Sequence, residues 1–104
     1  MKKDTKTRRQ PPKDIALVES ALSKQFPNVA VKRPNSLTLR VRIIDKCFRK
    51  LSKVARHEMV EPLLEQLPEE LQESIYFVLL LTPEEVATST MNEEFENPAP
   101  SLIA

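Results

Sequence analysis

The chain has 104 residues, 40% of them hydrophobic, which is enough for the core of one small domain. Its net charge is +1, and its single cysteine excludes both an internal disulfide and a four-cysteine zinc site. The longest apolar run, Ile75 to Leu81, is far shorter than the roughly 20 residues of a membrane span, and no apolar stretch follows the basic N-terminus as in a secretory signal. We therefore expect a cytoplasmic protein that does not enter a membrane.

The first predicted element is a helix from about Asp14 to Gln25. Asp14 can cap its start, and Pro27 ends it. Its apolar residues recur at helical spacing and predict a core-facing stripe: Ile15, Val18, Leu22 and Phe26. Residues 1–12 are polar and basic and end in two prolines, so we expect them to form a flexible basic tail.

Two strands are expected next. Val29 to Val31 has the composition of a short strand, Pro34-Asn35-Ser36 that of a turn, and Leu37 to Ile44 is the clearest strand in the chain. In this second strand Leu37, Leu39, Val41 and Ile43 share one face, whereas Thr38, Arg40 and Arg42 share the other. The alternation predicts one buried face and one exposed, basic face.

A central helix is predicted to begin at Ser52, whose hydroxyl can accept a hydrogen bond from a free N–H of the first turn. Its apolar stripe is formed by Val60, Leu63, Leu64 and Leu67. His57 lies at the edge of this stripe. Pro62 predicts a kink or a restart of the helix, and Pro68 predicts a further short turn through Glu73.

The nearly all-apolar stretch from Ile75 to Leu81 predicts a buried strand, and Pro83-Glu84-Glu85 predicts the start of a last helix. A strand, a helix and a strand in succession favour a right-handed crossover, which lays this strand parallel to Leu37–Ile44. The predicted fold class is α+β in two layers, α-β-β-α-β-α, with a three-stranded mixed sheet covered by helices on one face. We expect this domain to occupy residues 13–90, and residues 91–104 to form a flexible acidic tail.

The charges divide the chain into a basic and an acidic half. All 16 Lys and Arg lie between Lys2 and Arg56, where they are opposed by only four acidic residues, so this half carries +12. From His57 onward there are eleven glutamates and no Lys or Arg. Two interpretations remain open: the halves neutralise each other across the folded surface, or the basic half forms a docking face for an acidic partner.

Basic side chains in and after the second strand are the candidates for a face that binds nucleic acid or an acidic protein. They are Arg40, Arg42, Arg49, Lys50, Lys53 and Arg56. Lys53 and Arg56 lie in the first turns of the predicted central helix, where positive charge opposes the helix dipole, and this broken local rule favours a binding role. The chain has no glycine, so no glycine-rich loop can wrap a phosphate.

Catalysis finds little support in the sequence. One histidine, one cysteine and carboxylates spread along exposed helix faces form no set of nucleophile, base and orienting group. We therefore expect a non-enzymatic protein. We also expect it to be a monomer or a weak dimer.

The stretch from Phe48 to Val60 resembles the BolA proteins, which are small non-enzymatic α/β domains. The resemblance is carried by Phe48, Ser52, Arg56-His57 and Val60, and it continues in Leu81-Thr82-Pro83-Glu84-Glu85 after an apolar strand. Lys50 stands where the family usually has a glycine, and Glu58 where it tends to carry a basic residue. The order of the predicted elements also fits this family and is similar to that of KH domains. The resemblance implies a binding or regulatory protein.

The same resemblance implies a possible cofactor. BolA proteins pair with monothiol glutaredoxins and share a [2Fe-2S] cluster through a histidine that matches His57 and a cysteine or histidine in the loop between the first two strands. Here that loop, Lys32 to Ser36, has neither. Cys47 is a substitute ligand only if the connecting turn brings it to the same metal as His57; otherwise we expect a buried cysteine and an edge-packed histidine. The expectation is either no cofactor or a shared cluster that this chain holds poorly.

Overall fold

The computed structural model describes residues 13–33 and 38–97. Its elements are α1 (Lys13–Ser23), β1 (Val29–Lys32), β2 (Leu39–Ile44), the 3-10 turn η2 (Lys46–Phe48), α2 (Lys53–Leu64), α3 (Glu69–Ser74), β3 (Ile75–Leu81), the 3-10 turn η3 (Pro83–Glu85) and α4 (Thr90–Glu96). This order confirms the predicted α+β arrangement. The predicted N-terminal tail, the turn at Pro34-Asn35-Ser36 and Leu37 lie outside the described residues.

The three strands form one mixed sheet in the order β1-β2-β3. β1 pairs antiparallel with β2, with Val31 opposite Val41. β3 pairs parallel with β2, with Val78 opposite Val41, so the predicted parallel pairing of the two strands, which α2 and α3 connect, is confirmed. β2 is therefore the central strand, and β3 is an edge strand that pairs with β2 alone among the described strands.

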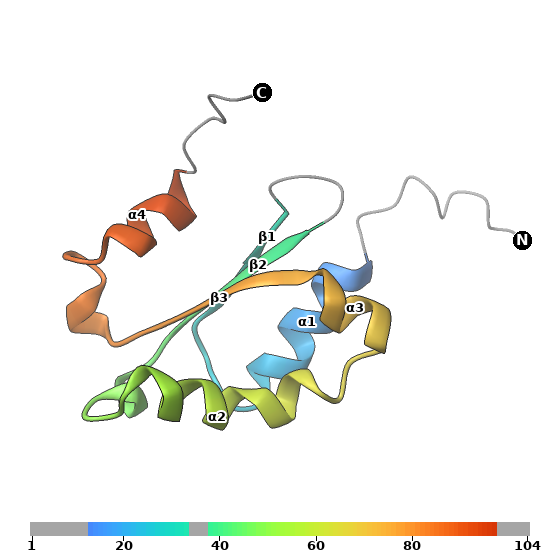
Figure 1. The fold of residues 1–104 in the computed structure, drawn as a ribbon, viewed down its shortest axis with the longest axis horizontal. Coiled ribbons are helices and arrows are strands. Elements are labelled where there is room, and N and C mark those ends of the chain that lie inside the picture. Colours follow the sequence, from blue (N-terminus) through green and yellow to red (C-terminus); the bar gives the residue numbers. More distant parts are fainter. Residues whose placement is uncertain (1–12, 34–37, 98–104) are drawn as a thin grey trace, which may run out of the picture.

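The core lies between the sheet and the helices α1 and α2, which cover the same face (Figure 1). The inward side chains of β2 confirm the predicted facing, because Leu39, Val41 and Ile43 are fully buried. They meet apolar residues of α1, η2 and α2, among them Val18, Leu22, Phe26, Phe48 and Val60. The rings of Phe26 and Phe48 pack with their centroids 5.6 Å apart, which joins the end of α1 to the turn before α2.

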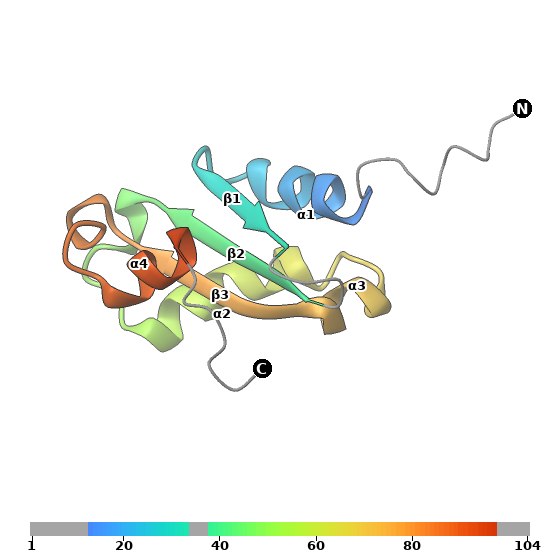
Figure 2. The same ribbon diagram turned by 90° about the horizontal axis from the view of Figure 1, so that it is seen from above.

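The opposite face of the sheet was predicted to be exposed, but α4 lies across it (Figure 2). Phe95 is fully buried there, with Arg42 Cζ 4.8 Å and Lys32 Nζ 5.0 Å from its ring centroid. The prediction of a loose tail from residue 91 is therefore wrong as far as Glu96, because α4 spans Thr90–Glu96, and residues 98–104 of that tail lie outside the described residues. The helix forms because Ser89 caps it, accepting a hydrogen bond from the N–H of Asn92, and because Phe95 packs on the basic side chains.

Three further elements differ from the sequence-based expectations. β3 is less buried than its apolar sequence predicted, because it lies at the sheet edge: Tyr76 is 78% exposed. α2 runs through Pro62 to Leu64 as one element, so no new helix starts there. The segment from Pro83 forms only a 3-10 turn before α4 begins. No helix among the described residues is long and apolar enough to cross a membrane.

Candidate binding site

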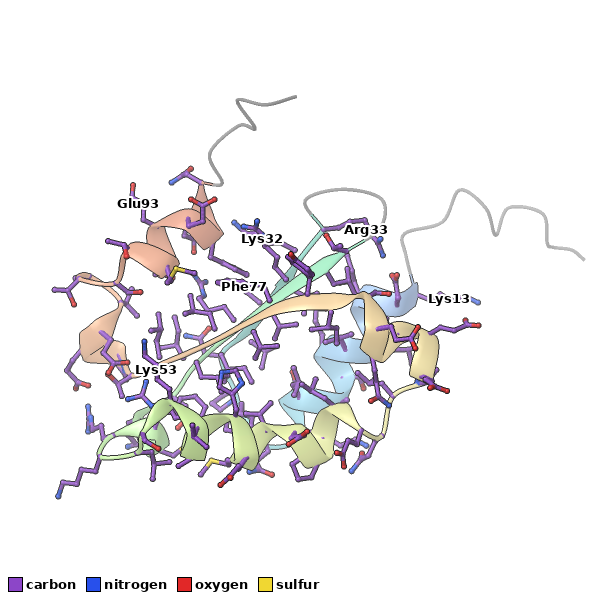
Figure 3. All side chains as sticks on the ribbon, in the orientation of Figure 1. Lys13, Lys32, Arg33, Lys53, Phe77 and Glu93 are labelled. Atoms are coloured by element: carbon purple, nitrogen blue, oxygen red, sulfur yellow. The ribbon has the colours of Figure 1, made fainter. Side chains whose placement is uncertain are left out.

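A cleft of about 410 Å³ opens between α2, the C-terminal part of β3 and the segment that leads into α4. Phe77 and Leu79 of β3 and Met91 of α4 supply its apolar lining. Lys53 and His57, one helical turn apart on α2, supply its basic side. Figure 3 shows Lys53 at the start of α2 and Phe77 on the side of the sheet that faces α4, so the cleft reaches round the edge of β3.

Arg56 ties together the three elements that frame this cleft. Arg56 is only 8% exposed. Nη1 donates to the carbonyl of Leu80 on β3 at 2.9 Å, and Nε donates to the carbonyl of Leu51 at 3.1 Å. Nη1 and Nη2 also donate to the two carboxylate oxygens of Glu85, at 2.8 Å and 3.0 Å. Arg56 thus holds the cleft together from within and is not available as a surface contact, contrary to its predicted role.

The electrostatics of this pair follow from its hydrogen bonds. The hydrogen bonds that Glu85 accepts from Arg56 lower its pKa most, and the bond from the backbone N–H of Thr82 adds to this effect, so that the pKa falls from 4.5 to about 2. The hydrogen bonds to Glu85 in turn raise the pKa of Arg56, so both groups remain charged over the physiological range. Glu85 was not among the site residues predicted from the sequence, although the capping box that it forms with Thr82 is a recognisable signal.

Two more of the predicted basic residues are paired with glutamates from the acidic half of the chain. Arg42 pairs with Glu96 and donates to Asn92 Oδ1 at 2.8 Å, and its hydrogen bond lowers the pKa of Glu96. Arg49 pairs with Glu84 and lowers the pKa of that carboxylate in the same way. In these pairs the two halves neutralise each other, as one of the two interpretations of the charge pattern predicted.

The remaining three predicted basic residues differ in exposure. Arg40 is half-buried and lies over the ring of Phe77, with Cζ 5.5 Å from the centroid. Lys50 and Lys53 are exposed and take no part in the ion pairs of the described residues. Lys50 has a φ of 68°, in the left-handed region that favours glycine. Their role in binding stays a prediction.

The structure does not bring Cys47 and His57 together. Cys47 is exposed, and its Sγ lies 3.9 Å from the sulfur of Met59. Met59 and His57 are two positions apart on α2, about 200° around the helix, so the thiol and the imidazole lie on different sides of it. His57 is exposed and lines the cleft instead of packing at the edge of the core. Burial, followed by a hydrogen bond with Asp45, raises the pKa of the Cys47 thiol.

The donor set for a metal is correspondingly small. No group of three or more His, Cys, Asp and Glu in residues 13–33 and 38–97 is placed to hold a metal ion. Of the two ligands predicted from the sequence, His57 lines the cleft and Cys47 does not. On its own, this chain thus offers a single imidazole at the cleft.

No protein-family model and no curated protein matches this sequence. Solved structures do match it. BolA1 from Arabidopsis thaliana matches with a TM-score of 0.54 and 22% identity, over 72% of this chain and 98% of that chain. The BolA domain of SufE1 from Arabidopsis thaliana matches with a TM-score of 0.56 and 21% identity, over 74% of this chain and 100% of that chain. The chain has the BolA-like fold.

A third match agrees with this assignment. BolA1 from Mus musculus matches the BolA-like chain with a TM-score of 0.51 and 19% identity, over 88% of this chain and 76% of that chain. The fold resemblance inferred from Phe48 to Val60 is therefore confirmed. Within this BolA-like fold, Ser52 caps α2 as expected, accepting a hydrogen bond from the N–H of Ala55 at 3.1 Å.

Proposed function

We propose that this BolA-like protein is a non-catalytic binding protein that recognises an acidic segment of a protein partner at the cleft beside Lys53 and His57. The observation that carries the proposal is which basic side chains are paired with glutamates and which are exposed. Arg42, Arg49 and Arg56 are each held by a glutamate, whereas Lys53 is exposed at the cleft and Lys50 is exposed three residues before it.

This distribution of charge favours a protein partner over nucleic acid. Nucleic-acid binding relies on several cations that follow the phosphates, and three of the six candidate cations are already neutralised. A protein segment needs fewer charges, because apolar side chains supply much of the contact. The cleft offers that combination, with Phe77, Leu79 and Met91 beside the basic residues.

The environment of His57 supports a non-catalytic role. In the described part of the chain no carboxylate or thiol forms a hydrogen bond with its imidazole, so nothing there orients it as a general base. An exposed, unoriented histidine beside a lysine is suited to contact an anionic group.

The test is partner capture from native lysate with the wild type and two charge-reversal variants. Lys53→Glu changes the cleft, and Lys13→Glu changes an exposed lysine at the start of α1 as the matched control. We expect the wild type and Lys13→Glu to retain the same protein, Lys53→Glu to lose it, and nuclease treatment to have no effect. Equal capture by all three proteins would overturn the proposal.

A titration of duplex and single-stranded DNA at two salt concentrations separates the other outcome. We expect no binding, or weak binding that both lysine variants reduce alike. Tight, salt-sensitive binding that Lys53→Glu alone removes would identify nucleic acid as the partner instead.

A second candidate function is a role in iron-sulfur handling with a monothiol glutaredoxin. It is favoured by the exposed imidazole of His57 on a BolA-like fold. The residues fit a shared [2Fe-2S] cluster only in part, because this chain supplies one donor and Cys47 lies on another side of α2. A partner would have to supply the remaining ligands.

This candidate is tested by reconstituting a mixture with glutaredoxin, iron and sulfide and recording visible absorption and circular dichroism. We expect a weak signal from the mixed complex that His57→Ala removes and Cys47→Ser leaves unchanged. A mixture that never gives a signal of its own would exclude the cluster, and a signal lost in either variant would show that Cys47 moves to the metal.

A further inference from the structure

The cleft continues as a groove along the free edge of β3. A second hollow lies beside the N-terminal part of the strand and is lined by Glu61, Leu64, Glu65, Gln72, Ile75 and Val78. Val78 lines both hollows, and α2 forms one wall of each. We call the two together the edge groove.

Except at Leu80, whose carbonyl already accepts a hydrogen bond from Arg56 of α2, β3 lacks the features that usually protect an edge strand. Its seven residues, Ile75–Leu81, include no charged residue and no proline. Tyr76, near its start, is the most exposed large apolar side chain among the described residues. An apolar edge of this length is a template for pairing with another strand.

The backbone of β3 presents hydrogen-bonding groups to the edge groove. The carbonyl of Leu80 accepts a bond from Arg56 of α2, so it points away from β2. Because backbone groups alternate in direction along a strand, those of Val78 point the same way as those of Leu80. Val78 therefore has an outward N–H and C=O at the middle of the groove.

The charges along the groove wall change sign from one end to the other. Lys53, His57 and Glu61 are spaced by four residues along one side of α2, and Glu65, the C-cap residue of the helix, continues the same spacing. The first two line one hollow and the last two line the other. This order is self-complementary: beside an antiparallel copy of the helix, Lys53 meets Glu65 and His57 meets Glu61.

We propose that the edge groove is occupied by a second copy of this chain, forming a two-fold dimer. β3 pairs antiparallel with β3 of the second copy, with the symmetry axis beside Val78, and the two sheets become one sheet of six strands. The same axis sets the two α2 helices antiparallel, so every basic residue at one end meets an acidic residue of the other copy. A second copy fits because one sequence supplies both the basic and the acidic end.

This inference does not rest on the proposed function, but it bears on it. The dimer covers Lys53 and His57, so partner binding at the cleft and self-association exclude each other. A protein that fails to dimerise can still bind the acidic partner, and the two proposals therefore fail independently.

The test uses sedimentation equilibrium of the full chain and of two charge-reversal variants, Lys53→Glu and Glu65→Lys. Each variant alone places like charges opposite each other at both ends of the dimer. We expect this repulsion to raise the dissociation constant of the dimer about tenfold or more. An equimolar mixture restores opposite charges at both ends, so the mixed dimer should form as well as the wild type. Both changes also suit the helix dipole, so neither should unfold α2.

A second pair of variants tests the strand edge. Tyr76→Lys places a charge on the β3 edge, and Leu17→Lys makes the same change at an apolar residue of α1 that is 48% exposed. We expect Tyr76→Lys to be monomeric and Leu17→Lys to dimerise like the wild type. A wild type that stays monomeric up to about 1 mM would overturn the proposal. So would an equimolar mixture no tighter than either charge variant, or an equal loss in Leu17→Lys.

Discussion

Replacement of Arg56 by methionine tests how the elements around the cleft are held together. Methionine keeps much of the aliphatic stem but removes every donor of the guanidinium. The carbonyl of Leu80 is buried, and a buried acceptor left without a donor costs about 1–3 kcal/mol. The partly buried carbonyl of Leu51 adds a smaller cost of the same kind.

The ion pair contributes less than these backbone contacts. The side chain of Glu85 is 41% exposed, so water can solvate its carboxylate once the arginine is gone, and such pairs are worth about 0–1 kcal/mol. The total for Arg56→Met is therefore about 3 kcal/mol, against about 1 kcal/mol for Glu85→Gln. In a domain of this size a loss of 3 kcal/mol lowers the melting temperature by roughly 15 °C.

Urea denaturation followed by far-UV circular dichroism measures both variants on the same scale. Arg49→Met is the matched control, because Arg49 and its partner Glu84 are both exposed, so water can replace the contact and the free energy of unfolding should change little. Equal losses in Arg56→Met and Glu85→Gln would show that the ion pair, and not the bonds to the carbonyls, carries the stability. A loss below about 1 kcal/mol for Arg56→Met would refute the reasoning altogether.

Three further changes probe other parts of the fold. Val41→Asp puts a carboxylate into the fully buried face of β2, and we expect it to lower the free energy of unfolding measured in urea by several kcal/mol. Val54→Asp is the control, because Val54 is exposed in the first turn of α2 and its replacement should change the stability little. Similar losses in the two variants would mean that the facing of β2 is misassigned. The pKa of Glu85 is about 2 in the fold and 4.5 ordinarily, so its contribution to stability is complete above about pH 4.5 and is lost as the pH falls to about 2. Glu85→Gln should therefore flatten this part of the curve of unfolding free energy against pH, and an unchanged slope would contradict the pairing. Phe95→Ala removes the buried ring under α4 and should speed amide hydrogen exchange in α4 while leaving β2 protected; unchanged exchange in α4 would show that the ring does not hold the helix.

The sheet and the helix starts could be predicted because their signals are local. Alternating side chains identify the buried face of β2, and Ser52 marks the start of α2 through its hydroxyl. The parallel pairing of β3 with β2 follows from the length of the connection between them. Each of these inferences needs only residues that are neighbours in the sequence or a general rule of chain topology.

The site could be predicted only in part because its contacts join distant residues. Arg42 meets Glu96 across 54 positions, and Arg56 meets Glu85 across 29. No pattern within either half shows which glutamate reaches which arginine. The helix α4 was missed for the same reason, since its acidic residues suggest a tail until the basic side chains of β1 and β2 lie beneath them. His57 was found because it is the only histidine, but its place in the cleft depends on β3 and α4.

The left-handed backbone at Lys50 has a consequence for the unfolded state of this glycine-free chain. A residue with a Cβ in that region is disfavoured by roughly 1–2 kcal/mol, which the folded turn must absorb. The same absence of glycine restricts the backbone of the unfolded ensemble, so fewer conformations are lost on folding. Strain in the turn at Lys50 lowers the stability of the fold, whereas the restricted unfolded chain raises it. A glycine at position 50 would relieve the strain but would also give the unfolded chain more conformations to lose on folding.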